Sequence, residues 1–399
     1  MERRTFLKSV ALGTGALYCA PSLAAEKNEK SVITIHLQGG VSAVETINPI
    51  PLATSEFRST RGFINTNAGY QLGGDFKELA KIGDKLSVVR SMRFRDANHQ
   101  TATLGYMTSH FHVPGSQKEP SAGSLVLKQY HPNNPKSGMP NYVKLRNVEG
   151  DDSAWLGIKY NGYDADSEGI KNMKLNVSKN QFDRRLKIMK MIDGQNILPG
   201  LGENWTDLKD MAVNIINGSA AEAFDLTNET NNLYPKTRFG QDLLLARRLV
   251  ERGSKFISLN SNSGWDFHAG ISAGFDRAAP ELDLGVAILI KDLEQRGLLD
   301  KTLVVVWSEF SRTKLNNQGG RDHNPGTNTL IFAGGGYNHG RVIGSTDKNG
   351  LVSEDNVLSP SDLFWTIGEH MDLDKRLTIK DSVNRPRHIF KDEAKNILT

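Results

Sequence analysis

The chain has 399 residues, 38% hydrophobic and 24% charged, which is typical of a globular protein and long enough for one large α/β domain. Its formal charge of +4 falls to about +2 without residues 1–25, which carry Arg3, Arg4 and Lys8 against Glu2, so a nucleic-acid partner is excluded. The only cysteine, Cys19, lies in that stretch, so any metal bound further along must use His, Asp, Glu or Asn.

Residues 1–25 have the features of an export signal. Arg3 and Arg4 form a twin-arginine pair, and the apolar stretch 10–20 that follows is too short to span a bilayer. We expect export by the twin-arginine route to the periplasm or the medium, with no membrane attachment after cleavage. Residues 26–399 are then expected to form a single domain. That route generally carries folded proteins, often built around a cofactor, which favours a metal.

The first strand of this domain is expected at 31–37. Gly39 and Gly40 follow it, and glycines allow a ligand to approach the backbone or φ to become positive. Further along, Asp75 is placed to cap a short helix that ends at Leu79, and the next buried strand is expected at 86–89.

His99 is the first candidate site residue. It begins a helix expected to run to Met107, where the positive end of the helix dipole disfavours the protonated imidazole. The neutral ring then has a nitrogen free to bind a metal or to accept a proton. A purely structural histidine is the alternative.

Few chemical signals appear between 123 and 231, where helical periodicity at 180–192 and 205–216 predicts covering helices, with Asn180 and Thr206 as possible caps. A long basic helix, 239–252, then precedes a strand at 255–259. Asp266 and His268 follow that strand, and two such residues in one loop are able to bind one cation, although a turn-capping Asp beside an exposed His would look the same. The next helix is indicated by apolar residues at Leu282, Val286, Leu289 and Leu293.

The strand expected at 302–307 is followed at once by polar residues, among them Glu309 and Arg312. A glycine-rich loop, 319–326, comes next and carries Asp322 beside His323, before a second apolar run at 329–333. Ligands bind beyond the carboxyl ends of strands in open α/β sheets, so we expect a site here, with a merely solvated connection as the alternative.

Alternating strands and helices predict an α/β sandwich with a mostly parallel central sheet and helices on both faces. Four strand ends each supply acids or imidazoles. Their convergence would create a pocket of oxygen and nitrogen ligands suited to a divalent metal cation.

Several segments together resemble an exported bacterial family, domain of unknown function 1501: GGVSAVETINP, NHQTATLGYMTS, GWDFH, LEQRGLLDKTLVVVWSEFSRT and GGRDHNPG. That family is similar to the alkaline phosphatase and sulfatase superfamily, whose members are α/β sandwiches that hold divalent metals and hydrolyse phosphate or sulfate esters. The resemblance carries over the family's Asp-x-His to Asp266 and His268, its Glu-Phe-Gly-Arg-Thr to residues 309–313, and its Asp-His to Asp322 and His323.

The chain departs from this pattern in places. Ala43, Glu45 and Asn48 stand where relatives have a His and two acids, and Asn324 replaces a second His. His99 falls at the position where sulfatases keep their nucleophile.

Two functions are therefore compared. The first is an exported metal-dependent hydrolase of sulfate or phosphate esters, acting on a small-molecule or polymer substrate. In it Arg312 or Arg321 would neutralise developing charge, and His99 or His323 would move a proton. The second is a non-catalytic exported protein that binds an anion or polymer. For the hydrolase, the predicted metal ligands are Glu45, Asp266, His268, Glu309, Asp322 and His323.

Overall fold

The structure, a computed structural model, describes residues 30–111, 115–134, 137–165, 177–193, 212–216, 220–229, 233–261 and 264–399. The predicted signal at 1–25 and most of the predicted helix at 205–216 lie outside these ranges. Within them, no helix is both long enough and apolar enough to cross a membrane.

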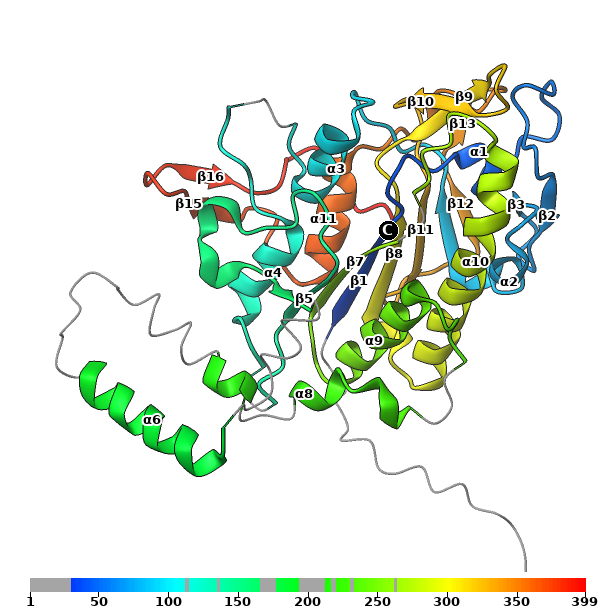
Figure 1. Ribbon diagram of the computed structural model, residues 1–399. Coiled ribbons are helices and arrows are strands. Elements are labelled where there is room, and N and C mark those ends of the chain that lie inside the picture. Colours follow the sequence, from blue (N-terminus) through cyan, green and yellow to red (C-terminus); the bar gives the residue numbers. More distant parts are fainter. Residues whose placement is uncertain are drawn as a thin grey trace, which may run out of the picture.

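An eight-stranded sheet forms the centre of the molecule (Figure 1). Strand β11 is antiparallel to both of its neighbours, β4 and β8, and every other pairing in this sheet is parallel. Across the sheet the strands are β12 (Arg341–Ile343), β4 (Leu86–Val89), β11 (Leu330–Gly334), β8 (Thr302–Trp307), β1 (Ser31–His36), β7 (Phe256–Asn260), β5 (Tyr142–Leu145) and β6 (Tyr163–Asp164).

Four two-stranded hairpins lie outside this sheet. They pair β2 (Phe63–Asn65) with β3 (Gln71–Gly73), β9 (Ser311–Leu315) with β10 (Arg321–Asn324), β13 (Ser345–Thr346) with β14 (Ser353–Asp355), and β15 (Thr378–Lys380) with β16 (Pro386–His388).

Helices cover both faces of the central sheet, with α3, α4 and α11 on one side and α9 and α10 on the other (Figure 1). The α-helices are α1 (Ala43–Thr46), α2 (Lys77–Ala80), α3 (His99–Thr108), α4 (Ala122–Tyr130), α6 (Lys179–Asp193), α8 (Ala220–Ala223), α9 (Arg238–Glu251), α10 (Ile271–Gln295) and α11 (Pro360–His370). Short 3-10 helices occupy Gly83–Lys85, Ala154–Leu156, Ile158–Tyr160, Leu226–Asn228 and Leu299–Lys301.

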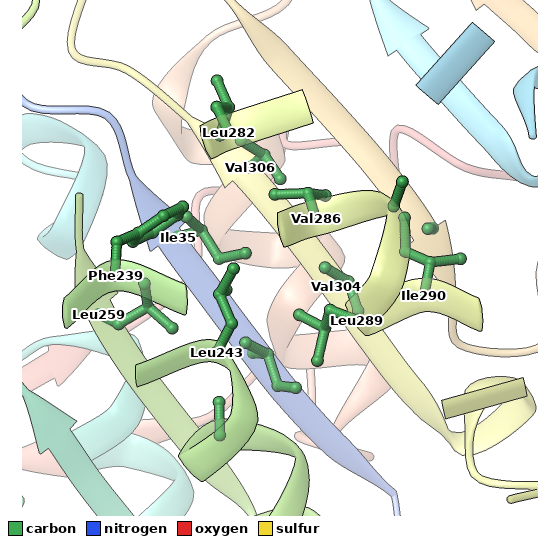
Figure 2. Close-up of a cluster of buried hydrophobic side chains, with 14 of the residues drawn as sticks. Ile35, Phe239, Leu243, Leu259, Leu282, Val286, Leu289, Ile290, Val304 and Val306 are labelled. Carbon is green, nitrogen blue, oxygen red and sulfur yellow. The ribbon is translucent and has the colours of Figure 1, made fainter. Parts of the chain in front are cut away.

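Two hydrophobic cores result from the alternation of side chains along the strands. Val304 and Val306 of β8 face α9 and α10, whereas Leu303 and Val305 belong to the core on the opposite face. Figure 2 shows the first core, in which Leu243 of α9 and the apolar stripe of α10 pack over β1, β7 and β8. Both β1 and β8 are buried along their whole length. From Leu303 to Trp307, β8 is an apolar run, whereas β1 also buries Ser31, Thr34 and His36.

The predicted α/β sandwich with a mostly parallel sheet is thus confirmed, with local corrections. The run after the glycine-rich loop, β11, enters the sheet antiparallel, and residues 321–324 of that loop form β10 of a hairpin. Asp75 caps nothing. The N-cap of α2 is Phe76, and the Asp75 carboxylate instead binds Arg61 at 2.7 Å.

Candidate functional site

The carboxyl ends of three neighbouring parallel strands meet at one edge of the sheet. His36 is the last residue of β1, Asp266 follows β7, and Glu309 follows β8. His99 begins α3 after the loop that leaves β4, and Asn98 caps that helix by accepting from the N–H groups of residues 100 and 101. The β9–β10 hairpin adds His323 from above this edge.

Three histidines at this edge are held through the same ring nitrogen. His99 Nδ1 lies 2.6 Å from Glu309 Oε1, His268 Nδ1 lies 2.8 Å from Asp322 Oδ1, and His323 Nδ1 lies 2.8 Å from the Ala97 carbonyl. Carbonyl and carboxylate oxygens only accept, so each Nδ1 carries the proton and donates it. In the neutral ring, each Nε2 therefore offers a lone pair.

These Nε2 atoms gather around the Asp266 carboxylate. Asp266 Oδ2 lies 3.4 Å from His99 Nε2, while Asp266 Oδ1 lies 3.0 Å from His268 Nε2 and 3.3 Å from His323 Nε2. One ligand atom each of His99, Asp266 and His323 lie within 4.8 Å of one another. We call His99, Asp266, His268 and His323 the His–Asp cluster.

The structure brings Asp266, His268, Asp322 and His323 side by side, although 54 positions separate His268 from Asp322 in the sequence. That they line one pocket and bind one metal stays a prediction.

The His–Asp cluster fits a divalent cation. His99 Nε2 is buried and has no hydrogen-bond partner, which is costly for a polar atom unless something else binds it. The Nε2 atoms of His268 and His323 face each other at 3.0 Å, an arrangement of two lone pairs that requires a proton or a cation near them. Imidazole nitrogen and carboxylate oxygen are ligands that borderline divalent metals accept.

Glu309 holds the histidines in place. Its buried carboxylate accepts from His36 Nε2 at 3.1 Å, from the Gly39 N–H at 2.9 Å and from the Ser308 hydroxyl at 3.1 Å, in addition to His99. Burial raises the pKa of the Glu309 carboxyl, but the hydrogen bonds from His36 and His99 lower it more, so the group is ionised. Both oxygens are occupied, so Glu309 orients metal-ligand candidates rather than offering a free oxygen of its own.

Arg312 is buried, and its guanidinium is already satisfied by the protein. It donates to the carbonyls of Gly39 and Gly40, to the Arg321 carbonyl at 3.1 Å and to Asp266 Oδ1 at 2.6 Å. Burial raises the pKa of the Asp266 carboxyl, yet the hydrogen bond and charge of Arg312 lower it overall. Arg312 thereby keeps Asp266 ionised and ties it to the loop after β1.

Glu45 and Arg321 form a separate buried pair. Arg321 Nε lies 3.0 Å from Glu45 Oε1, and the other Glu45 oxygen accepts from the Ser59 hydroxyl at 2.7 Å and the Thr60 N–H at 2.9 Å. Arg321 also donates to the carbonyls of residues 56, 58 and 313. Neither residue belongs to the His–Asp cluster, so the structure places the predicted ligand Glu45 and the predicted charge-neutralising Arg321 in the framework beneath it.

The pKa values of His99 and His323 are shifted in opposite directions. The hydrogen bond to Glu309 raises the pKa of His99, with burial acting against it, whereas burial lowers the pKa of His323. His323 is thus favoured as a neutral ring, the form that binds a metal.

His36 is a site residue that the sequence patterns do not indicate, because the strand expected at 31–37 places it inside the strand. Its ring stacks on Trp307 with centroids 4.3 Å apart, and its Nδ1 is buried without a partner. It was identifiable as the one imidazole at the carboxyl end of the first strand.

A polar pocket of about 440 Å³ opens beside His36 and His99. Its wall is made of charged, amide and hydroxyl side chains, including Gln38, Lys144, Asp151 and Asn260. Lys144 is paired with Asp164 at 2.9 Å, and Asn260 donates to Gln38 Oε1 at 2.8 Å. The pocket gives a polar molecule room next to the histidines.

Comparison with known proteins gives a family and distant structures. The family described as "Protein of unknown function (DUF1501)" matches residues 29–399. None of the curated proteins compared with the chain matches it. Similar solved structures include a sulfatase from Pseudoalteromonas sp., at 10% identity, TM-score 0.44 and coverage of 93% of this chain and 72% of that one. Another is a phosphonate monoester hydrolase of Agrobacterium radiobacter, at 9% identity, TM-score 0.43 and coverage of 87% and 74%.

Proposed function

Since the chain belongs to the DUF1501 family, whose description includes no reaction, we propose from the site itself that it is an exported metal-dependent hydrolase of sulfate or phosphate esters. The observation that supports this most strongly is the arrangement of three histidines. Each donates a hydrogen bond from Nδ1, and each has Nε2 close to the carboxylate of Asp266. Metal-binding histidines are typically oriented in this way by a carboxylate or a carbonyl on the other ring nitrogen.

His99, Asp266 and His323 are the proposed ligands of the cation. A bound divalent cation would polarise an oxygen of the ester and stabilise negative charge in the transition state. The protein's contribution is to hold the ligands rigidly. Glu309 fixes the ring of His99, the Ala97 carbonyl fixes that of His323, and Arg312 fixes Asp266.

His268 is proposed to move the proton. Its ring is 46% exposed, so it lies on the open side of the cluster, and Asp322 holds its Nδ1–H at 2.8 Å. Its Nε2, which lies 3.0 Å from both Asp266 Oδ1 and His323 Nε2, would take a proton from water or deliver one to the leaving alcohol. Asp322 is then a positioning residue that stabilises the charged imidazole.

The polar pocket beside His36 and His99 is the proposed place of the alcohol part of the substrate. Its lining of amides, two lysines and carboxyl groups suits hydroxyl groups, which both donate and accept hydrogen bonds. The substrate class is therefore an ester of a polyhydroxylated compound rather than of an apolar alcohol.

Elemental analysis of the purified mature protein and of His99→Asn tests the proposal. The wild type is expected to hold a stoichiometric divalent metal and to release sulfate or phosphate from an aryl ester. Chelation should abolish this turnover, and adding the metal back should restore it. The variant is expected to lose both the metal and the activity while its unfolding temperature stays near that of the wild type. His388→Asn is the matched control, because His388 is exposed on β16 and remote in sequence from the cluster.

If His99→Asn keeps its metal but loses turnover, His99 acts on the substrate rather than on the cation. If the wild type binds no metal and hydrolyses no ester, the hydrolase proposal is wrong. The alternative of a non-catalytic anion-binding or polymer-binding protein then holds. That alternative is favoured by Glu45, which is committed to Arg321 where relatives of the chain offer acids near the site.

A further inference from the structure

A second pocket, with a positively charged lining, lies beside the start of α11 and the residues that flank α3. It measures about 600 Å³, and its walls include Arg93, Arg95 and Lys391 but no Asp or Glu. We call it the basic pocket. All three cationic residues are exposed. A surface hollow lined by charges of one sign raises the local concentration of ions of the opposite sign.

The positive charge of this pocket is not compensated by the protein. Within the described ranges, Arg93, Arg95 and Lys391 form no ion pair, and the only partner found for a guanidinium is the Phe111 ring, 3.5 Å from Arg95 Cζ. Cations around neighbouring pockets differ, because Lys144 is paired with Asp164 at 2.9 Å and Arg385 with Asp381 at 3.0 Å. An anion in the basic pocket would therefore displace no existing carboxylate.

Two further features of the lining suit an oxyanion. Ser109, one of the lining residues, is 4% exposed, and its buried hydroxyl has no hydrogen-bond partner. The pocket also includes Pro360 and Ser361, the first residues of α11, where the helix dipole is positive. Asp362 is occupied in that first turn by capping the helix through Ser359.

The basic pocket is adjacent to the His–Asp cluster along the chain. Gly326 follows His323 by three residues, and Arg95 precedes His99 by four, so each pair lies within roughly 11 Å and 14 Å at full chain extension. The Phe94 N–H donates to the Pro325 carbonyl at 3.0 Å, which joins the two segments. One extended molecule is thus able to reach both sites.

We propose that the basic pocket is a subsite for a second sulfate or phosphate group on the substrate, and that the substrate is a chain carrying repeated anionic groups. The inference rests on the proposed function, because the ester cleaved at the cluster and the group held by Arg93 and Arg95 belong to one molecule. Binding at the subsite is nevertheless a property of these side chains alone. It is measurable without turnover.

The experiment compares two double variants of the full mature protein with equal loss of charge. Arg93→Gln with Arg95→Gln removes two cations of the basic pocket. Arg184→Gln with Arg185→Gln removes two exposed arginines of α6, which Figure 1 shows far from the site. The probe is short-chain dextran sulfate, and its affinity is measured by titration calorimetry after chelation of metal. Plain dextran serves as the uncharged control, and polyphosphate as the phosphate arm.

The pocket variant is expected to bind dextran sulfate about tenfold more weakly than the wild type, and the α6 variant within about twofold. Stronger loss with polyphosphate than with dextran sulfate identifies phosphate as the preferred group. An equal loss of affinity for dextran sulfate in both variants, or no loss of affinity in the pocket variant, would contradict the subsite proposal. If an active ester is found, the pocket variant should raise KM for an ester of the polymer and leave kcat/KM for a small aryl ester unchanged. If no ester is turned over, the hydrolase proposal is wrong, but the measured affinities for dextran sulfate still test the subsite.

Discussion

Glu309 shows how one side chain organises the site. Two imidazoles, His36 and His99, donate to its carboxylate, and the Gly39 N–H and the Ser308 hydroxyl complete the set of four donors. Ionising a buried carboxylate costs free energy, and the four hydrogen bonds that it accepts offset that cost. Its use here is to fix the ring of His99 and to favour the charged or metal-bound form of that ring.

Asp151 allows a pH-dependent prediction outside the His–Asp cluster. Its carboxyl is 4% exposed, one oxygen has no partner, and the other meets only the Ser258 hydroxyl. Burial raises the pKa of Asp151 to about 8, with the Ser258 contact acting against it and the charges of Asp164 and Asp152 adding to it. Between about pH 4 and pH 8 the Asp151 carboxyl is therefore protonated in the folded protein, whereas in the unfolded chain, where its pKa is the ordinary 3.8, it is ionised.

The contribution of the Asp151 carboxyl to the free energy of unfolding is greatest below about pH 4 and is lost as the pH rises toward about 8. Asp151→Asn has no proton to lose. We expect its free energy of unfolding, relative to the wild type, to increase from pH 4 to pH 8 by on the order of a few kcal/mol. Urea unfolding at several pH values measures this. Exposed Asp300→Asn is the control for the removal of one carboxylate, and a difference for Asp151→Asn that does not change with pH would contradict the prediction.

At the level of elements, the site depends on the docking of the β9–β10 hairpin against the loop after β7. The Arg321 N–H donates to the Phe267 carbonyl at 3.0 Å, and the Ile271 N–H donates to the Gly319 carbonyl at 2.9 Å. This docking brings Asp322 and His323 to His268. Sequence patterns predicted the two polar segments but not the hairpin, because nothing local in 319–326 specifies its antiparallel partner.

Gly320 is the residue that allows this close approach. A Cβ there would lie 2.1 Å from the carbonyl carbon of His268, which is backbone that has little room to move. Gly320→Ala should separate the hairpin from the loop, reduce bound metal several-fold and cost about 1–3 kcal/mol of stability. Metal content and urea unfolding measure both effects. Gly264→Ala, where a Cβ meets nothing within 4 Å, is the control. Normal metal content in Gly320→Ala would show that the docking is not required.

For the whole molecule, export remains a proposal that depends on residues 1–25. We expect Arg3→Lys with Arg4→Lys to retain the protein in the cytoplasm, because the twin-arginine carrier reads that pair rather than its charge. Cell fractionation and immunoblotting measure the distribution. Lys8→Arg in the same segment should leave export unchanged. Periplasmic accumulation of the double variant would indicate the general secretion route instead.

The sequence by itself determined five of the eight strands of the central sheet and the proximity of the polar residues that follow them, but it did not predict β5, β6 and β12. Buried strands are visible as apolar runs, and parallel strands place the residues after them at one edge, so Asp266, His268, Asp322 and His323 were expected together. Apolar runs and their periodicity depend on residues that are neighbours in the sequence, so one sequence is enough to recognise them. Only the tertiary structure decided which partner each charged group takes. Glu45 binds Arg321 and Glu309 binds two histidines because those atoms lie within about 3 Å, across more than 200 residues of sequence. The basic pocket is likewise tertiary, since α11 and the loops beside His99 and His323 meet only in the fold.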